Sequence, residues 1–151
     1  MTMSASQVLA RTNLTGAIGS IGPELCWEAL ESNTLGRLAV VLDGKIHIFP
    51  INYAVDGTRI YFRTAAGSKL FALRTHPEVA LEIDAVDDEA AYSVVVKGLA
   101  AWVESPDEVA IADALPLRAW IPTLKLRWVR IWAAEVTGRA FRRGAEPLPY
   151  V

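Results

Sequence analysis

The sequence contains very few of the residues that stabilise a fold through disulfides or metal ions. Among its 151 residues there are one cysteine and two histidines. A single cysteine cannot form a disulfide within the chain, and it cannot complete a structural zinc site with only two histidines. A length of 151 residues with 52% hydrophobic residues instead predicts one domain with a hydrophobic core.

Long hydrophobic runs and a strong net charge are also absent. No stretch of about 18 apolar residues occurs, and residues 1–22 lack the cationic start and apolar core of a signal peptide. We therefore expect a cytoplasmic protein without a membrane partner. The formal net charge is −2, so we expect no nucleic-acid partner either, although the C-terminal quarter is locally basic.

The usual sequence motifs of nucleotide hydrolysis, serine hydrolysis and zinc catalysis are missing. Cys26 lies in the first turn of a predicted helix, where the helix dipole could lower its pKa. A lone cysteine beside Trp27 is nevertheless more typical of a small buried hydrophobic residue. We interpret His47 and His76 as structural residues, and the sequence assigns no catalytic residue and no metal ligand.

The chain divides into three segments. Residues 1–22 are rich in Ser, Thr, Ala and Gly without periodicity, which predicts a flexible arm or a segment that packs on a partner. A short helix begins at Pro23 and ends near Asn33. Residues 23–143 are predicted to form the domain, and residues 144–151 a C-terminal tail.

Most of the domain is predicted to be strand. Asp43-Gly44 and Asp56-Gly57 are hairpin-turn dipeptides, and they separate three apolar runs into a meander. Short helices are predicted from Ser68 to Thr75 and from Ser105 to near Leu115. The expected strands are residues 36–42, 45–55, 59–64, 79–86, 92–103 and 127–137. Without βαβ units, this order predicts a mainly β (α+β) fold, a six-stranded antiparallel barrel with short peripheral helices.

The second strand, residues 45–55, is apolar on both faces. Ile46 and Ile48 lie on one face, and Phe49, Ile51 and Tyr53 on the other. Only one face can point into a small barrel, so the other must be covered. A homodimer is the simplest explanation, and coverage by the protein's own helices is the alternative.

A phosphate site is predicted where the third strand ends. Two cations and two hydroxyls lie close together at a strand-to-helix turn of small residues, where backbone N–H groups are also available. These side chains are Arg63, Thr64, Ser68 and Lys69. The alternative is an ordinary capped turn with solvated Arg and Lys.

Pro50 interrupts the strand that precedes this turn. A proline in that position predicts an edge or a bulge, where the backbone can bond to something other than a strand. The backbone of Pro50, Ile51, Asn52 and Tyr53 would suit the edge of a flat heteroaromatic ring. The alternative is a purely structural bulge.

These segments together resemble a known family. GRLAVVLDGKIHIFPINYAVDGTRIYFRTAAGSKL, VALEID, YSVVVKG and RWVRIWAAEVTGR, in this order and spacing, are similar to the pyridoxamine 5′-phosphate oxidase-like, FMN-binding split-barrel proteins. The resemblance covers residues 23–143 and is greatest to the short bacterial single-domain branch. It implies a split barrel and a homodimer that binds FMN at the subunit interface.

The resemblance also assigns roles to individual residues. Arg63, Thr64, Ser68 and Lys69 would hold the FMN phosphate, and residues 50–53 would lie beside the isoalloxazine. Ser93 occupies a position where the oxidase has a polar cofactor-binding residue. Trp120 lies in a proline-flanked loop that similar proteins place near the flavin, and its alternative role is to seal the barrel.

One departure from the family affects the substrate. The oxidase has an Arg-x-His motif near its C-terminus, whereas this chain has Arg139 followed by Ala140 and Phe141. The expected function is therefore an FMN-dependent oxidoreductase with an unknown substrate. A flavin carrier without catalysis and a deazaflavin-dependent reductase are the alternatives.

Overall fold

The computed structural model describes residues 2–65, 69–117 and 126–145. The elements are mostly strands, joined by short turns and accompanied by short helices. In chain order they are α1 (Ala5–Ala10), β1 (Ile18–Ile21), α2 (Pro23–Ser32), β2 (Leu35–Leu42), β3 (Lys45–Asp56), β4 (Arg59–Ala65), the 3₁₀ helix η1 (Lys69–Arg74), β5 (Glu78–Val86), β6 (Ala90–Trp102), α3 (Pro106–Asp113) and β7 (Leu126–Arg142).

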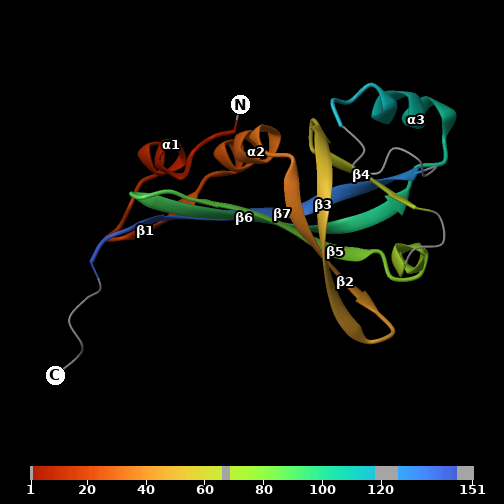
Figure 1. The fold of residues 1–151 in the computed structure, drawn as a ribbon, viewed down its shortest axis with the longest axis horizontal. Coiled ribbons are helices and arrows are strands. Elements are labelled where there is room, and N and C mark those ends of the chain that lie inside the picture. The colour runs from red at the N-terminus through yellow and green to blue at the C-terminus, as the bar shows by residue number, and fades with distance from the viewer. Residues whose placement is uncertain (1, 66–68, 118–125, 146–151) are drawn as a thin grey trace.

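The strands form one antiparallel sheet that closes on itself (Figure 1). Its order is β1-β7-β4-β3-β2-β5-β6, and a further pairing of β6 with β7 joins the ends of a six-strand ring. β1 is the seventh strand, and it pairs with the last part of β7 from Gly138 to Phe141. The predicted antiparallel barrel is confirmed, with one more strand than the sequence indicates.

The barrel interior is filled because apolar residues alternate along each strand. Leu38 and Val40 of β2 point inward, as do Val94 and Val96 of β6 and Ile131 of β7, and all are fully or almost fully buried. Successive side chains of a strand point to opposite faces, so the residues between them lie on the outside. The core is therefore continuous around the ring.

The N-terminal segment corrects the prediction for residues 1–22. Ser4 and Gln7 form a capping box at the start of α1, and Ala5 and Val8 are buried. The structure therefore contains a helix and a strand before Pro23, where the sequence predicts an arm without them. A six-residue helix and a four-residue strand are too short to give a periodic hydrophobic pattern.

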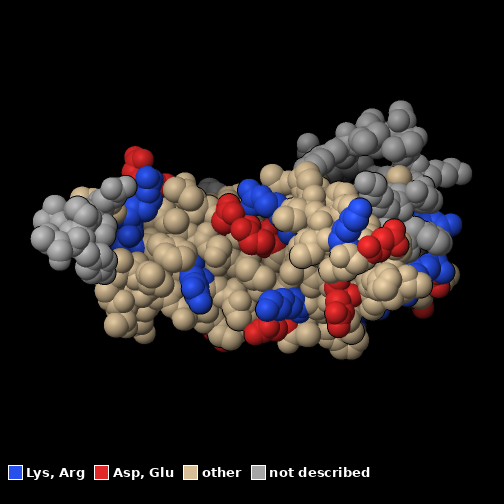
Figure 2. All heavy atoms as spheres, turned by 90° about the horizontal axis from the view of Figure 1, so that it is seen from below, with Lys and Arg blue, Asp and Glu red and all other residues tan. Residues whose placement is uncertain are grey.

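The helices lie outside the ring. α1 and α2 lie along the part of β6 and β7 that extends beyond the barrel, and α3 lies near β4 at the other end (Figure 1). In the described segments, no helix has both the length and the apolar character required to span a bilayer. Figure 2 shows a face on which acidic and basic side chains lie near one another, with wide uncharged areas between them.

Candidate flavin site at the barrel split

The candidate site lies where β3 and β4 separate. Their ladder extends from Asp56–Arg59 to Tyr53–Phe62. Beyond it, in the described part of the chain, β3 continues along β2 and β4 continues along β7. The barrel is thus split on one side. We call the two strand edges that border the split its banks. Pro50 to Asn52 form the β3 bank, and Arg63 to Ala65 form the β4 bank.

Pro50 lies at the predicted edge. It pairs with Arg37 of β2, and the described ladder of β4 does not reach it. A proline without an N–H is tolerated there because that edge of the strand needs no ladder bond. Its side chain is exposed and that of Asn52 half-buried. Both lie on the outward pleat of β3.

Ile51 and Tyr53 face the opposite way, into the core. Ile51 is buried, and the Tyr53 hydroxyl donates a hydrogen bond of 2.7 Å to the carbonyl oxygen of Leu30 in α2. Burial, with a smaller contribution from Tyr92, raises the pKa of Tyr53. The side chains of these two residues are therefore not available to a ligand at the split.

Arg63 is the cation on the β4 bank. Its side chain is 27% exposed and lies over the indole of Trp128, with 4.1 Å between the guanidinium carbon and the ring centroid. One guanidinium nitrogen, Nη2, lies 3.3 Å from Oδ1 of Asp113 in α3. A guanidinium has five N–H donors, so most of them remain for another acceptor.

Of the other predicted phosphate-binding residues, the structure describes Thr64 and Lys69 but not Ser68. Thr64 is almost fully buried beside Arg63, and Lys69 is the first residue of η1. Ser68 and Trp120 lie outside the described residues. The helix predicted from Ser68 to Thr75 is a six-residue 3₁₀ helix and not a two-turn α-helix. Pro77 prevents a longer helix, because the residue before a proline, His76, avoids the α region.

Ser93 lies far from the split within one chain. It pairs with Arg139, which is eleven residues beyond Trp128 along β7, roughly 35 Å of strand at about 3.3 Å per residue. Ser93 lines a cavity of about 360 Å³ at the other end of the sheet from the split. The residues around this cavity are Ser20, Ile21, Ser93, Val95, Val136, Thr137, Gly138 and Arg139. One protomer therefore does not bring Ser93 to Arg63.

The sequence does not predict the polar cluster under α3. Both oxygens of Glu108 lie 2.6 Å from Nη1 of Arg130, and Glu108 also accepts a 2.9 Å bond from the Tyr61 hydroxyl. Burial opposes ionisation of Glu108. The hydrogen bonds from Arg130 and Tyr61, with the charge of Arg59, outweigh it, so the pKa of Glu108 is lowered. Arg130 is one of several charged residues of β7, so the sequence pattern does not single it out.

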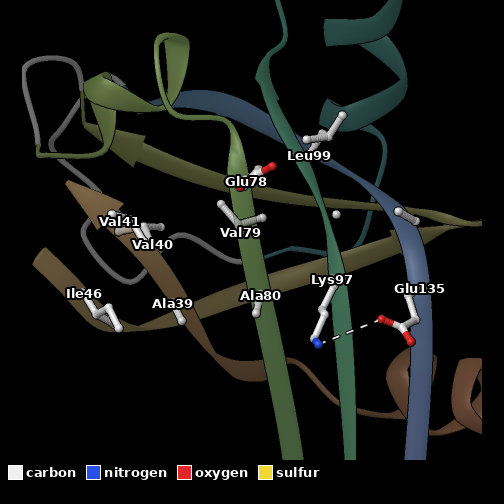
Figure 3. Close-up of a pocket in the computed structure, with 12 residues that line it drawn as sticks. Ala39, Val40, Val41, Ile46, Glu78, Val79, Ala80, Lys97, Leu99 and Glu135 are labelled. Carbon is white, nitrogen blue, oxygen red and sulfur yellow. Dashed lines mark ion pairs between the residues drawn. The ribbon is translucent and has the colours of Figure 1, made fainter. Parts of the chain in front are cut away.

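An apolar groove of about 490 Å³ lies on the outer face of the barrel (Figure 3). Val41 and Ile46 come from the β2–β3 hairpin, and Leu99 comes from β6. Lys97 and Glu135 form a 4.0 Å ion pair at its side. Ile46 is 75% exposed and Ile48 is 66% exposed, so the described helices do not cover this face of β3.

The closed antiparallel ring, open between β3 and β4 with an arginine on one bank, defines a split-barrel protein. Residues 23–140 match the family described as pyridoxamine 5′-phosphate oxidase, and the chain belongs to this family.

Similar solved structures agree in fold. A Corynebacterium glutamicum protein, provisionally named a pyridoxamine 5′-phosphate oxidase, is 44% identical with a TM-score of 0.77. The match covers 83% of this chain and 99% of that one. The FAD-binding protein of Mycobacterium smegmatis is 38% identical with a TM-score of 0.74, over 83% of this chain and 99% of that one. An uncharacterised Mycobacterium tuberculosis protein is 40% identical over 62% of this chain and 84% of its own length.

Proposed function

We propose that this protein binds a flavin nucleotide, FMN, and works as an oxidoreductase. The observation that carries the proposal is the position of Arg63 on one bank of the split, opposite the edge of β3 at Pro50. A charged group that can bind phosphate then lies next to a strand edge that can border a planar ring. The FAD-binding relative at 38% identity supports a flavin.

The residues at the split fit such a ligand. Arg63 and Thr64 would hold the phosphate, together with Ser68 and Lys69 from the following turn. The backbone of residues 50–53 would lie beside the isoalloxazine, and Trp120 would cover it. The 3.3 Å contact of Arg63 with Asp113 is long and single, so it leaves the guanidinium able to contact a phosphate oxygen.

When bound, a flavin supplies the hydride chemistry. The chain's own residues orient the ring, compensate the phosphate charge and keep water away from the split. Arg139 without a following histidine does not favour oxidation of a vitamin B6 compound, so the substrate class stays open. A carrier without catalysis and a deazaflavin-dependent reductase are the competing functions.

We also propose a homodimer with the cofactor at its interface. Ser93 cannot reach Arg63 within one protomer, so a second copy would have to supply it. The exposed outer face of β3 and the adjoining groove offer an apolar surface for that copy.

Titration of the purified apoprotein tests cofactor choice. We expect FMN to bind more tightly than riboflavin, FAD or a deazaflavin. Arg63→Ala should weaken FMN binding about ten- to a hundredfold, because a charge-assisted phosphate contact is worth about 1.5–3 kcal/mol. Riboflavin, which lacks the phosphate, should be unaffected. Arg11→Ala is the matched control, since Arg11 pairs with Glu28 on the helical side of the molecule.

Arg59, at the start of β4, is a less suitable control. Its charge acts on both Tyr61 and Glu108 and favours the ionised form of each. Equal FMN and riboflavin affinities in the wild type would contradict the proposed phosphate site. An absence of binding to every flavin would contradict the proposed function itself.

Rapid-mixing reduction separates the enzyme from the carrier. The flavin-loaded protein is mixed with NADH or NADPH, and the loss of flavin absorbance is followed. Fast and saturable reduction is expected of the oxidoreductase. Reduction no faster than that of free FMN would favour the carrier.

A further inference from the structure

Two side chains that have no role in the proposed cofactor contacts, Trp128 and Asp113, contact Arg63. Trp128 of β7 pairs with Arg63 of β4 and is only 4% exposed. Its indole N–H donates a 2.7 Å hydrogen bond to Oδ1 of Asp113. Its ring also meets Tyr61 edge to face, with centroids 6.4 Å apart and planes at 88°. The indole is therefore fixed along its edge and on one side.

Arg63 lies over the face of this fixed ring. The 4.1 Å distance from its guanidinium carbon to the ring centroid is that of a cation–π contact. The same Oδ1 of Asp113 that accepts from Trp128 also lies 3.3 Å from Nη2 of Arg63. A long arginine side chain loses much rotamer freedom when it binds an anion, and these two contacts remove part of that freedom beforehand.

Asp113 itself is held in place by the helix that carries it. It is the last residue of α3, and Glu108 on the same helix binds Arg130 and Tyr61. The contact of Asp113 with the indole is shorter than its contact with Arg63, 2.7 Å against 3.3 Å. The carboxylate therefore makes its shorter hydrogen bond with the indole N–H of Trp128 and its longer contact with the guanidinium of Arg63.

We propose that Asp113 and Trp128 are positioning residues, which hold the Arg63 guanidinium in the orientation that receives a phosphate group. The inference rests on the proposed function, because it takes the flavin phosphate as the group that Arg63 receives. It differs from a simple charge effect. A carboxylate near an anion site weakens anion binding by repulsion, whereas a positioning carboxylate strengthens it.

Substitutions at Asp113 distinguish the two roles. Asp113→Asn keeps an oxygen that can accept from both Trp128 and Arg63, and Asp113→Ala removes it. The measured quantity is the ratio of FMN to riboflavin affinity, which isolates the phosphate contribution. We expect Asp113→Ala to lower this ratio about three- to tenfold, and Asp113→Asn to stay within about twofold of the wild type.

Trp128→Phe provides a second variant that does not depend on the folding of Asp113→Ala. It keeps a ring face under Arg63 and the Asp113–Arg63 contact but removes the N–H, so the ratio should fall by a smaller factor than in Asp113→Ala. The double variant should fall no further than Asp113→Ala alone, because Asp113→Ala already breaks the bond that Trp128→Phe removes. A higher ratio in both Asp113 variants would overturn the proposal, since it indicates repulsion. An equal loss of FMN and riboflavin affinity would also overturn it, since it indicates a structural role alone.

Inorganic phosphate separates this inference from the cofactor assignment. The indole N–H signal of Trp128 is assigned by its absence in Trp128→Phe and followed by NMR as phosphate is added. A shift in the wild type that is lost in Arg63→Ala and weakened in Asp113→Ala supports the positioning role even if no flavin binds. Flavin binding without any phosphate contribution, and without this shift, would overturn the positioning role and leave flavin binding intact.

Discussion

At the scale of single residues, Gly98 has the least room for a side chain among the glycines that the structure describes. It lies at the register shift between β6 and β7, where Lys97 pairs with Glu135 and Gly98 with Ala133. A Cβ on Gly98 would lie 2.1 Å from the carbonyl oxygen of Trp132. Two backbones approach each other here because a bulge bends β7, and only glycine permits that approach.

Gly98→Ala should therefore destabilise the barrel strongly. The clash is with backbone, which cannot move aside as a flexible side chain can. We expect a loss of about 3 kcal/mol in the free energy of unfolding, at the upper end of the overpacking range. Chemical denaturation measures it. Gly144→Ala is the control, because a Cβ there meets no atom within 4 Å, and an equally small change in both variants would contradict the clash.

Residue patterns could predict only part of the site. Two features of the site are local and can be read from the sequence alone. They are the pair Arg63 and Thr64 at a strand end and the proline at position 50. Asp113 is 50 residues from Arg63 in the chain and 15 from Trp128. Their contact depends on where α3 lies on the barrel, and no local pattern encodes that. Ser93 is the opposite case. The family resemblance assigns it to the site, but within one protomer it lies far from the split, and its position in the sequence gives no sign of that distance.

At the scale of elements, the Asp87 carboxylate bonds α1 to the turn between β5 and β6, in addition to the buried contacts of Ala5 and Val8. Asp87 accepts hydrogen bonds from the backbone N–H and the hydroxyl of Ser6, at 2.8 Å and 2.6 Å. It also accepts from the backbone N–H groups of Glu89 and Ala90, both at 2.9 Å. The bond from the Ser6 side chain, then that from Glu89, contributes most to lowering the pKa of Asp87 to about 2.

This lowered pKa predicts an acid-dependent attachment of α1. A carboxyl with a lower pKa in the folded state stabilises that state above its unfolded pKa of about 3.9. The contribution decreases as pH falls from about 4 to about 2. The protection factor of the Ser6 amide, its exchange rate relative to an unstructured peptide at the same pH, should fall over this range in the wild type. In Asp87→Asn the protection factor should be low already at pH 5, whereas the neighbouring Asp88→Asn should behave like the wild type. Exchange at Ser6 that is unchanged in Asp87→Asn would contradict this attachment.

The hairpins explain why the strands could be predicted well. Asp43 and Gly44 both have positive φ, 53° and 74°, as a type I′ turn requires. In the second hairpin Asp56 pairs with Arg59, so the loop residues are Gly57 and Thr58, and only Gly57 has positive φ. The predicted meander is confirmed, but its second turn lies one residue later than the Asp-Gly pair indicates.

At the scale of the whole molecule, apolar side chains remain on the outer surface of the ring. Ile46 and Ile48 on β3, Leu99 on β6 and Trp132 on β7 are all more than half exposed. Isolated exposed hydrophobic residues are common, but Ile46 and Leu99 both line the groove of about 490 Å³, and an exposed apolar surface around such a groove favours an interface.

The homodimer proposal predicts that charge on this surface separates the subunits. Ile46→Asp combined with Ile48→Asp should give a particle with the mass of one chain by light scattering, with unchanged circular dichroism. The wild type should have twice that mass. Ile111→Asp is the control, since Ile111 is 46% exposed on α3, away from the groove. A wild-type monomer at micromolar concentration would contradict the proposal.

β7 closes the barrel. It is the last strand in the sequence, and it pairs with β1, β4 and β6. Ile18 and Phe141, which pair, are more than a hundred residues apart in the chain. During synthesis, the edges of β4 and β6 that pair with β7 stay open until β7 emerges from the ribosome. Non-local pairing slows folding, and open strand edges favour association between chains. The yield of native protein should therefore depend on translation rate and chaperone supply more than on the stability of the finished barrel.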